Sequence, residues 1–196
     1  MMKSCQQNRP HDNMVLTDES IYQQFLGGDR AALRTLVERH REGLILFVYG
    51  YVGNMDDAED LQMETFAALL CGDARFPGKG SFKAWLYGVA RNQARIYLRR
   101  KAIHARAMDK YRAAPQGDLP EISLVHSERN RLLYAALSRL PRDYRQVLIL
   151  TEMDGMSAEE AGQAMHKTRA QVYHLVSRGK KALRETLEGM GYDAQP

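Results

Sequence analysis

Residues 76–100 of this chain, FPGKGSFKAWLYGVARNQARIYLRR, decide which fold the sequence can adopt. Aromatic residues and glycines open the stretch, and the period from Trp85 onward predicts an amphipathic helix. Arg91, Arg95 and Arg99 are spaced four residues apart, so they form one basic face of that helix. An ordinary surface helix with solvated arginines would show the same pattern. The rest of the chain has to distinguish the two interpretations.

The two sides of the predicted helix differ in character. Tyr87, Gly88 and Asn92 are expected on the basic side. The apolar side, which suits burial, holds Trp85, Leu86, Val89, Ala90, Ile96 and Tyr97. Aromatic residues beside a row of arginines are what a protein needs to hold phosphates and to stack unpaired bases.

Length and composition indicate a globular protein with one large or two small domains. The chain has 196 residues, of which 44% are hydrophobic and 27% charged. It contains no apolar run of membrane-spanning length and no charged-then-apolar leader, so we expect a cytoplasmic location without membrane insertion. The formal charge is +4, but residues 91–112 hold eight Lys and Arg against one acid, whereas residues 56–64 hold five acids and no base. Separate acidic and basic surfaces suggest two different partners.

Catalytic and metal-binding motifs are missing from the sequence. The two cysteines, Cys5 and Cys71, have neither CxxC nor Cys/His ligand spacing, and we expect Cys71 to be buried. The six histidines are scattered, and no glycine-rich phosphate loop occurs. We therefore expect no enzymatic activity, no metal and no cofactor.

The periodic segments all predict helices, so the expected fold class is all-α, with two small helical domains joined by a flexible linker. Residues 1–17 are polar and predicted to be disordered, and residues 18–112 form the first domain. Residues 113–123 have a linker composition, and residues 124–190 form the second domain. Asp18 or Asp29 can cap the early helices.

The second domain carries a helix-turn-helix pattern. Residues 157–160, SAEE, form a capping box that starts one helix, and a short turn at His166 precedes a basic helix over residues 169–187. A purely structural helical hairpin would have the same outline. The side chains available for base edges and phosphates are Arg169, Gln171, Tyr173, His174, Arg178, Lys180 and Lys181.

In both halves the chain resembles the extracytoplasmic-function (ECF) group of the sigma-70 family of bacterial RNA polymerase sigma factors. The resemblance covers residues 18–188 and is specific through the order and spacing of its motifs. These motifs are DDAEDLQMETF (56–66), FPGKGSFKAWLYGVARNQA (76–94), LSRLPRDYRQVLIL (137–150), GMSAEEAGQAM (155–165) and SRGKKALRETL (177–187). The resemblance implies a sigma factor that binds core RNA polymerase, recognises −10 and −35 promoter elements and opens the promoter.

The acidic helix of the first domain is implied to bind the polymerase. In the family this helix contacts the clamp helices of the β′ subunit, and the matching residues here are Asp57, Asp60, Gln62, Met63 and Glu64. Asp57, Asp60 and Glu64 share one helical face. Met63 stands where the family usually has glutamine.

The opening stretch is implied to capture a base flipped from the −10 element. Phe76, Lys79 and Asn92 match the positions expected to line the base pocket. For Trp85 a structural role is favoured over base contact. The remaining residues implied in −10 binding and melting are Phe82, Tyr87, Arg91, Arg95 and Arg99.

The recognition helix departs most from the family. His166 stands where the family commonly has glycine, so we expect a left-handed backbone at that residue. The side chains that read bases differ as well, so the −35 sequence does not carry over. Further implied partners are the β flap of the polymerase and an anti-sigma factor.

Two other kinds of protein remain alternatives at this point. An autonomous helix-turn-helix regulator would bind duplex operators without polymerase, which explains only the second domain. A helical adaptor would bind protein alone.

Overall fold

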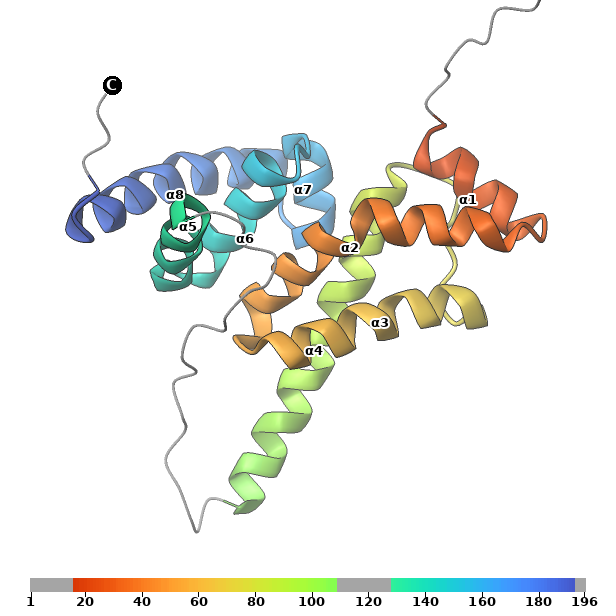
Figure 1. Ribbon diagram of the computed structural model, residues 1–196, viewed down its shortest axis with the longest axis horizontal. Helices are drawn as coiled ribbons and strands as arrows, with labels where there is room; N and C mark the ends of the chain where they lie inside the picture. Colours follow the sequence, from red (N-terminus) through yellow and green to blue (C-terminus); the bar gives the residue numbers. More distant parts are fainter. Residues whose placement is uncertain (1–15, 109–127, 193–196) are drawn as a thin grey trace, which may run out of the picture.

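The computed structural model describes residues 16–108 and 128–192, and all regular structure in these ranges is helical (Figure 1). The expected all-α fold is confirmed. The elements are α1 (Asp18–Leu26), α2 (Arg30–Val52), α3 (Met55–Cys71), α4 (Phe82–Met108), α5 (Glu128–Arg139), α6 (Arg142–Leu148), the π-helical turn η1 (Ile149–Met153), α7 (Ala158–Met165) and α8 (Arg169–Gly189). We call α1–α4 the N-terminal domain and α5–α8 the C-terminal domain. None of the helices in these ranges is long and apolar enough to cross a bilayer.

Local sequence signals set the helix ends of the N-terminal domain. The carboxylate of Asp29 caps α2 by accepting the N–H of Ala31 at 2.8 Å. Gly53 and Gly72 end α2 and α3 in the left-handed conformation, with φ of 70° and 79°. Most of the predicted N-terminal extension, and all of the predicted linker at 113–123, lie outside the described residues.

Thr17, and not Asp18, caps α1, because its hydroxyl accepts the N–H of Ser20. The Asp18 carboxylate instead contacts α2, where Oδ2 lies 2.7 Å from His40 Nε2 and Oδ1 accepts a hydrogen bond from Arg39 at 3.0 Å. Burial raises the pKa of Asp18, but the hydrogen bonds and charges of His40 and Arg39 outweigh it and lower that pKa below its ordinary value of 3.8.

Asp18→Asn is expected to lower the free energy of unfolding at neutral pH by about 1–3 kcal/mol, because a half-buried charge-assisted hydrogen bond is lost. A carboxyl whose pKa is depressed by folding stabilises the fold above its unfolded pKa, near 3.8, and loses this contribution as the pH falls through its folded pKa. Urea unfolding at pH 7 and pH 3 should therefore show a smaller gap between variant and wild type at pH 3. Asp56→Asn, at an exposed position of α3, is the matched control. An equal gap at both pH values would contradict the assignment.

Aromatic rings form the core that joins α1, α4 and the loop before α4. Tyr22 and Phe82 are almost fully buried, and their ring centroids are 5.1 Å apart. Phe76 packs edge-on against both rings, and its N–H donates to the Tyr22 hydroxyl at 3.2 Å. Trp85 lies against the same cluster. The cluster fixes the loop over residues 72–81 to the start of α4.

In the C-terminal domain, α8 packs against α5, α6 and α7. Gly179 is buried on α8, where a Cβ would lie 3.3 Å from Leu148 of α6. Val172 is buried, and Val176 and Leu183 are half-buried, as the apolar stripe of this helix predicts. The predicted helix over residues 141–153 forms as α6 followed by the π-helical turn.

Two burial expectations for single residues are wrong. Cys71 is exposed, because it is the last residue of α3 and lies beyond the core. Ile96 is 50% exposed. The C-terminal half of α4 projects past the other described helices, so none of them covers this part of its apolar side (Figure 1).

The two domains pack against each other through α2 and α4 (Figure 1). Gln146 of α6 is fully buried, and its amide donates to the carbonyl of Phe47 at 3.0 Å. Lys83 of α4 pairs with the Asp154 carboxylate at 3.1 Å, and its ammonium also donates to the Asp154 carbonyl. We call this packed state the closed arrangement.

Two glycines of α2 make this approach possible. Gly43 and Gly50 are seven residues apart and therefore share one face of the helix. A Cβ on Gly43 would overlap the Tyr87 hydroxyl of α4 and lie 2.7 Å from the Asp154 carboxylate, and one on Gly50 would overlap the Gln146 amide. Because helical glycine costs about 1 kcal/mol relative to alanine, the two positions give up helix stability where the second domain docks.

Gly50→Ala is expected to separate the domains while α2 itself becomes more stable. The added methyl group collides with Gln146 of the C-terminal domain, whereas alanine favours the helix by about 1 kcal/mol. Small-angle X-ray scattering should show a larger radius of gyration without loss of helical circular dichroism. Gly88→Ala is the matched control, because a Cβ there meets nothing within 4 Å. An unchanged radius of gyration in Gly50→Ala would refute the role of this glycine.

Candidate nucleic-acid interface

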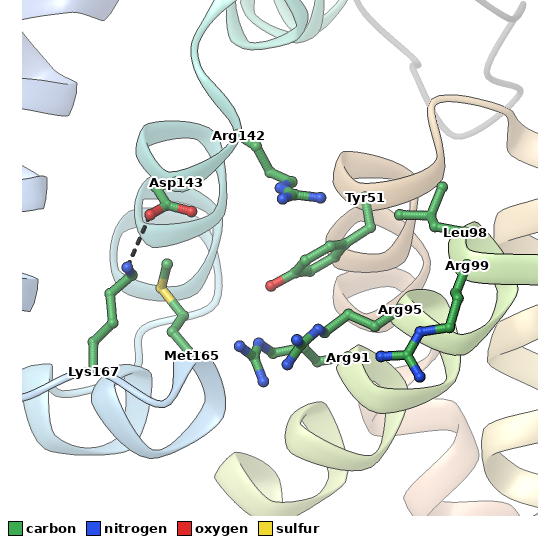
Figure 2. A pocket seen from close by; sticks show the side chains of 9 residues that line it. All are labelled: Tyr51, Arg91, Arg95, Leu98, Arg99, Arg142, Asp143, Met165 and Lys167. Atoms are coloured by element: carbon green, nitrogen blue, oxygen red, sulfur yellow. Dashed lines mark ion pairs between the residues drawn. The ribbon is translucent and has the colours of Figure 1, made fainter. Parts of the chain in front are cut away.

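The three arginines predicted to form a basic face do lie together on α4. Arg91, Arg95 and Arg99 line the same side of a cavity of about 390 Å³ (Figure 2). Arg91 is half-buried, and the other two are exposed. Asn92 is exposed on the same helix. This geometry provides the expected row of cations for phosphates.

The expected exposure of Tyr87 is corrected by the structure. Tyr87 is fully buried, with its ring 5.1 Å from that of Phe47 and its hydroxyl beside the Asp154 carboxylate. Burial, with a further contribution from Asp154, raises its pKa well above the ordinary value of 10.0. The periodicity of α4 missed this because the C-terminal domain covers that side of the helix. A contact between Tyr87 and DNA stays a prediction that requires the domains to separate.

The residues predicted to line a base pocket differ in their exposure to solvent. Lys79 and Asn92 are exposed, whereas Phe76 is only 7% exposed and its ring lies within the aromatic cluster. Phe82 is fully buried in that cluster, and half-buried Trp85 packs on it, in agreement with the structural role favoured for Trp85. In the closed arrangement the aromatic part of the predicted pocket is therefore directed inward.

Helix α7 of the C-terminal domain covers the loop that precedes α4. A Cβ on Gly80 would lie 3.4 Å from Oε1 of Gln163. Burial raises the pKa of Glu160, but hydrogen bonds from Ser157 and Ser81 and the charge of Lys83 bring it below its ordinary value. The same contacts show that α7 lies directly on the start of α4.

The acidic face of α3 is largely open to solvent. Asp60 and Glu64 are exposed, and among the side chains that the structure describes (residues 16–105 and 132–192) no basic group lies within 4 Å of either. Asp57 pairs with Lys101 of α4 at 3.1 Å. Met63 is 60% exposed, whereas Gln62, which was expected at the same interface, is only 5% exposed.

A groove of about 370 Å³ between α2 and α3 extends this acidic face. Its α2 side was missed by the sequence analysis, because only the tertiary contact between the two helices brings these residues beside Met63. The groove is lined by Val37, Arg41, Ile45, Glu59, Gln62, Met63 and Phe66.

The helix-turn-helix forms as the sequence predicts. Ser157 and Glu160 make the expected capping box at the start of α7. His166 adopts the left-handed conformation, with φ of 55° and ψ of 49°, which confirms the expectation for this position. The N–H of Lys167 donates to the carbonyl of Gly162 at 2.8 Å and closes the turn.

The predicted base-reading residues lie on exposed positions of α8, but several already have partners within the chain. Gln171 closes a second capping box by accepting the N–H of Thr168 at 2.9 Å. Arg169 donates to the Tyr173 hydroxyl at 3.1 Å and lies over that ring. The cations near the middle of the helix form weaker or exposed pairs, Lys180 with Glu152 and Lys181 with Glu185.

A shallow groove of about 380 Å³ marks the part of this helix most open to a ligand. Its lining combines three of the predicted base-reading residues with Lys167 and a half-buried leucine, and consists of Lys167, Gln171, His174, Leu175 and Arg178. His174 and Arg178 stand four residues apart, so both can reach the same stretch of a DNA groove.

His166→Gly is expected to stabilise the chain by about 1 kcal/mol, because glycine adopts a left-handed backbone without the steric cost of a Cβ. Urea unfolding followed by circular dichroism measures the change. His166→Ala removes the same imidazole but keeps the Cβ, so it should not stabilise. Equal stabilisation by both variants would point to the imidazole and not to the backbone.

Two cations that the sequence analysis did not single out face the α4 arginines. They are Arg142 of α6 and Lys167 of the turn, and both line the same cavity (Figure 2). The sequence gives no local signal for these two residues, because they come close to α4 only when the two domains pack against each other. The described residues contain no group of three or more His, Cys, Asp or Glu side chains that could hold a metal ion.

Comparison with known proteins places both domains. Residues 36–103 match the family described as Sigma-70 region 2, and residues 130–183 match Sigma-70, region 4. The ECF RNA polymerase sigma factor SigE of Mycolicibacterium smegmatis is 31% identical over 82% of this chain, which spans 64% of that relative's length. The ECF RNA polymerase sigma-E factor of Salmonella typhimurium is 29% identical over 86% of this chain and 93% of its own length.

Solved structures agree on the fold. The sigma factor RpoE of Bartonella quintana, in complex with the anti-sigma factor NepR, has a TM-score of 0.64 at 24% identity, over 79% of this chain and 96% of that one. CnrH, in complex with the cytosolic domain of CnrY, has a TM-score of 0.60 at 24% identity, over 88% and 97% of the two chains. The chain belongs to the ECF sigma factors of the sigma-70 family.

Proposed function

We propose that this sigma factor binds core RNA polymerase through the acidic face of α3 and the adjoining groove. The observation that carries the proposal is that Asp60 and Glu64 are exposed carboxylates without a basic partner in the described residues, beside the exposed side chain of Met63. Apolar contact at Met63 with carboxylates around it suits a partner helix that is basic and amphipathic. The β′ clamp helices of the polymerase are that partner in this proposal.

Residues 18–112 would be the module for the −10 element. Arg91, Arg95 and Arg99 would follow the phosphates of the melted strand, and Lys79 and Asn92 would contact a flipped base. Phe76 could stack on that base only after the aromatic cluster rearranges, since its ring is now buried. Helix α7 covers the loop before α4, so binding also requires the domains to separate.

Residues 124–190 would be the module for the −35 element, joined to the first by a linker over residues 113–123. His174 and Arg178 are the best-placed readers, because they line an open groove, whereas Gln171 is held by the helix cap. The second groove on α8, which includes Leu183 and Leu187, is the proposed contact for the β flap. The protein would act without catalysis of its own and in the cytoplasm, where the polymerase is.

An anti-sigma factor is part of the proposal. One structural neighbour of this chain is the sigma factor RpoE in complex with the anti-sigma factor NepR, and another is CnrH in complex with the cytosolic domain of CnrY. An inhibitor that favours the closed arrangement would keep the loop before α4 covered.

Asp60→Lys combined with Glu64→Lys is expected to abolish binding to core polymerase and promoter-specific transcription in a reconstituted system. Charge reversal replaces attraction by repulsion at the centre of the proposed contact. Asp73→Lys combined with Glu185→Lys reverses two exposed charges elsewhere and should leave core binding unchanged. Unchanged core binding in the α3 variant would remove this face from the polymerase interface.

The same system separates the alternatives. An autonomous regulator predicts tight, sequence-specific binding of duplex DNA without polymerase in a gel shift. A helical adaptor predicts no gain of promoter-specific transcription when the chain is mixed with core polymerase. Asn92→Ala should leave core binding intact and lower promoter opening, which potassium permanganate footprinting detects.

A further inference from the structure

A cavity of about 390 Å³ lies where the two domains meet (Figure 2). Its volume is at the lower end of the range typical of small-molecule sites. Helix α4 supplies one wall, the end of α2 supplies Tyr51, and the C-terminal domain supplies the opposite wall (Figure 2). The lining residues are Tyr51, Arg91, Arg95, Leu98, Arg99, Arg142, Asp143, Met165 and Lys167.

The cavity is strongly cationic. Its lining holds four arginines and Lys167 against one carboxylate, Asp143, which is already paired with Lys167 at 2.8 Å. In the described part of the chain no carboxylate lies within 4 Å of any of the four arginines. Like charges that face each other across a domain contact oppose that contact. An anion between the walls would turn this repulsion into attraction.

The arginines are arranged to hold an anion from two sides. Figure 2 shows the arginine side chains of α4 extending from one wall of the cavity. On the opposite wall, Arg142 extends from α6 toward Tyr51 of α2. The Arg142 guanidinium lies 5.5 Å from the centre of the Tyr51 ring, a cation–π contact that holds it at the edge of the cavity. Burial raises the pKa of Tyr51, and the neighbouring charge of Arg91 opposes that rise, so the tyrosine remains a neutral hydroxyl beside the arginine. A guanidinium held in this way can donate two parallel hydrogen bonds to a phosphate.

We infer that this cavity binds a small polyphosphate anion, as an inorganic chain or as the phosphate chain of a nucleotide, which holds the two domains closed. A chain of phosphates can contact Arg142 on one wall and the α4 arginines on the other, whereas a single phosphate reaches fewer of them. The inference depends on the closed arrangement and not on the proposed function. Because the α4 arginines are also the proposed phosphate contacts for the −10 strand, the anion and the promoter would compete for them.

Isothermal titration of the full-length protein with tripolyphosphate, ATP and orthophosphate, at one fixed ionic strength and without polymerase, tests the inference. Saturable binding is expected for tripolyphosphate or ATP, at least about tenfold tighter than for orthophosphate, since each charge-assisted hydrogen bond adds to affinity. Tighter binding of tripolyphosphate assigns the site to an inorganic chain, and tighter binding of ATP assigns it to a nucleotide. No saturable binding of either overturns the inference.

Variants locate the site. Arg142→Gln is expected to weaken binding by about tenfold, and Arg142→Lys, which keeps the charge but loses the planar fork, by less. Arg34→Gln removes the same charge from an exposed position of α2 outside the cavity and should leave the affinity unchanged. Equal weakening by Arg142→Gln and Arg34→Gln would mean diffuse attraction to a basic protein and would refute the site.

Domain closure gives a second readout, which also covers the case that Arg142→Gln opens the domains by itself. Small-angle scattering of the wild type should show a smaller radius of gyration, or a smaller open fraction, with saturating tripolyphosphate than with chloride of equal ionic strength. Arg99→Gln, on the opposite wall and exposed, should lose this compaction as well. Binding without any effect on the open fraction would overturn the bridging role. Neither the titration nor the scattering involves core polymerase, so a negative result leaves the proposed function unaffected.

Discussion

The face of α2 that carries Gly43 and Gly50 is the constraint on which the closed arrangement depends. Only a helix surface without side chains at these positions lets the Asp154 carboxylate and the Gln146 amide approach the α2 backbone. Gln146 is then fully buried and its amide N–H donates to the Phe47 carbonyl, whereas its amide oxygen has no hydrogen-bond partner in the described residues. A buried polar group of this kind favours one specific approach, since any other would leave the amide unpaired. The glycines and the glutamine thus define a single way for the domains to meet.

This contact has a direct consequence for the loop before α4. Once Asp154 pairs with Lys83, helix α7 must lie over Gly80 and Ser81, and Tyr87 is closed off beneath the C-terminal domain. The surfaces most suited to a melted strand are therefore partly covered in the free protein. The exposed carboxylates of α3 and the open groove on α8 are not, so the first contacts with other molecules can form before the domains separate.

Local signals in the sequence determined much of the fold, and tertiary contacts determined the rest. The capping box at Ser157, the left-handed His166 and the row of α4 arginines were predictable, because each follows from chemistry within a few residues or from the helical repeat. Tyr87 and Ile96 were assigned to the wrong environments because their burial depends on contacts that are distant in sequence. The burial of Tyr87 is caused by a domain far away in sequence, and the exposure of Ile96 by the end of the bundle halfway along α4.

At the candidate site, the difference between what local sequence predicts and what tertiary contacts add is larger. The sequence identifies the α4 arginines but not Arg142 and Lys167, which oppose them only because of the domain contact. That contact brings positive charge toward positive charge. It is held by the Gln146 amide, the Lys83 ion pair, a hydrogen bond from Arg145 to the Gly50 carbonyl, the contact of Arg142 with Tyr51, and apolar side chains that join the cores of the two domains. Contacts between domains of one chain resemble transient protein–protein interfaces, and the arrangements that they connect commonly differ by about a few kcal/mol. Any anion, strand or protein that prefers one arrangement by that amount can therefore set the position of the C-terminal domain.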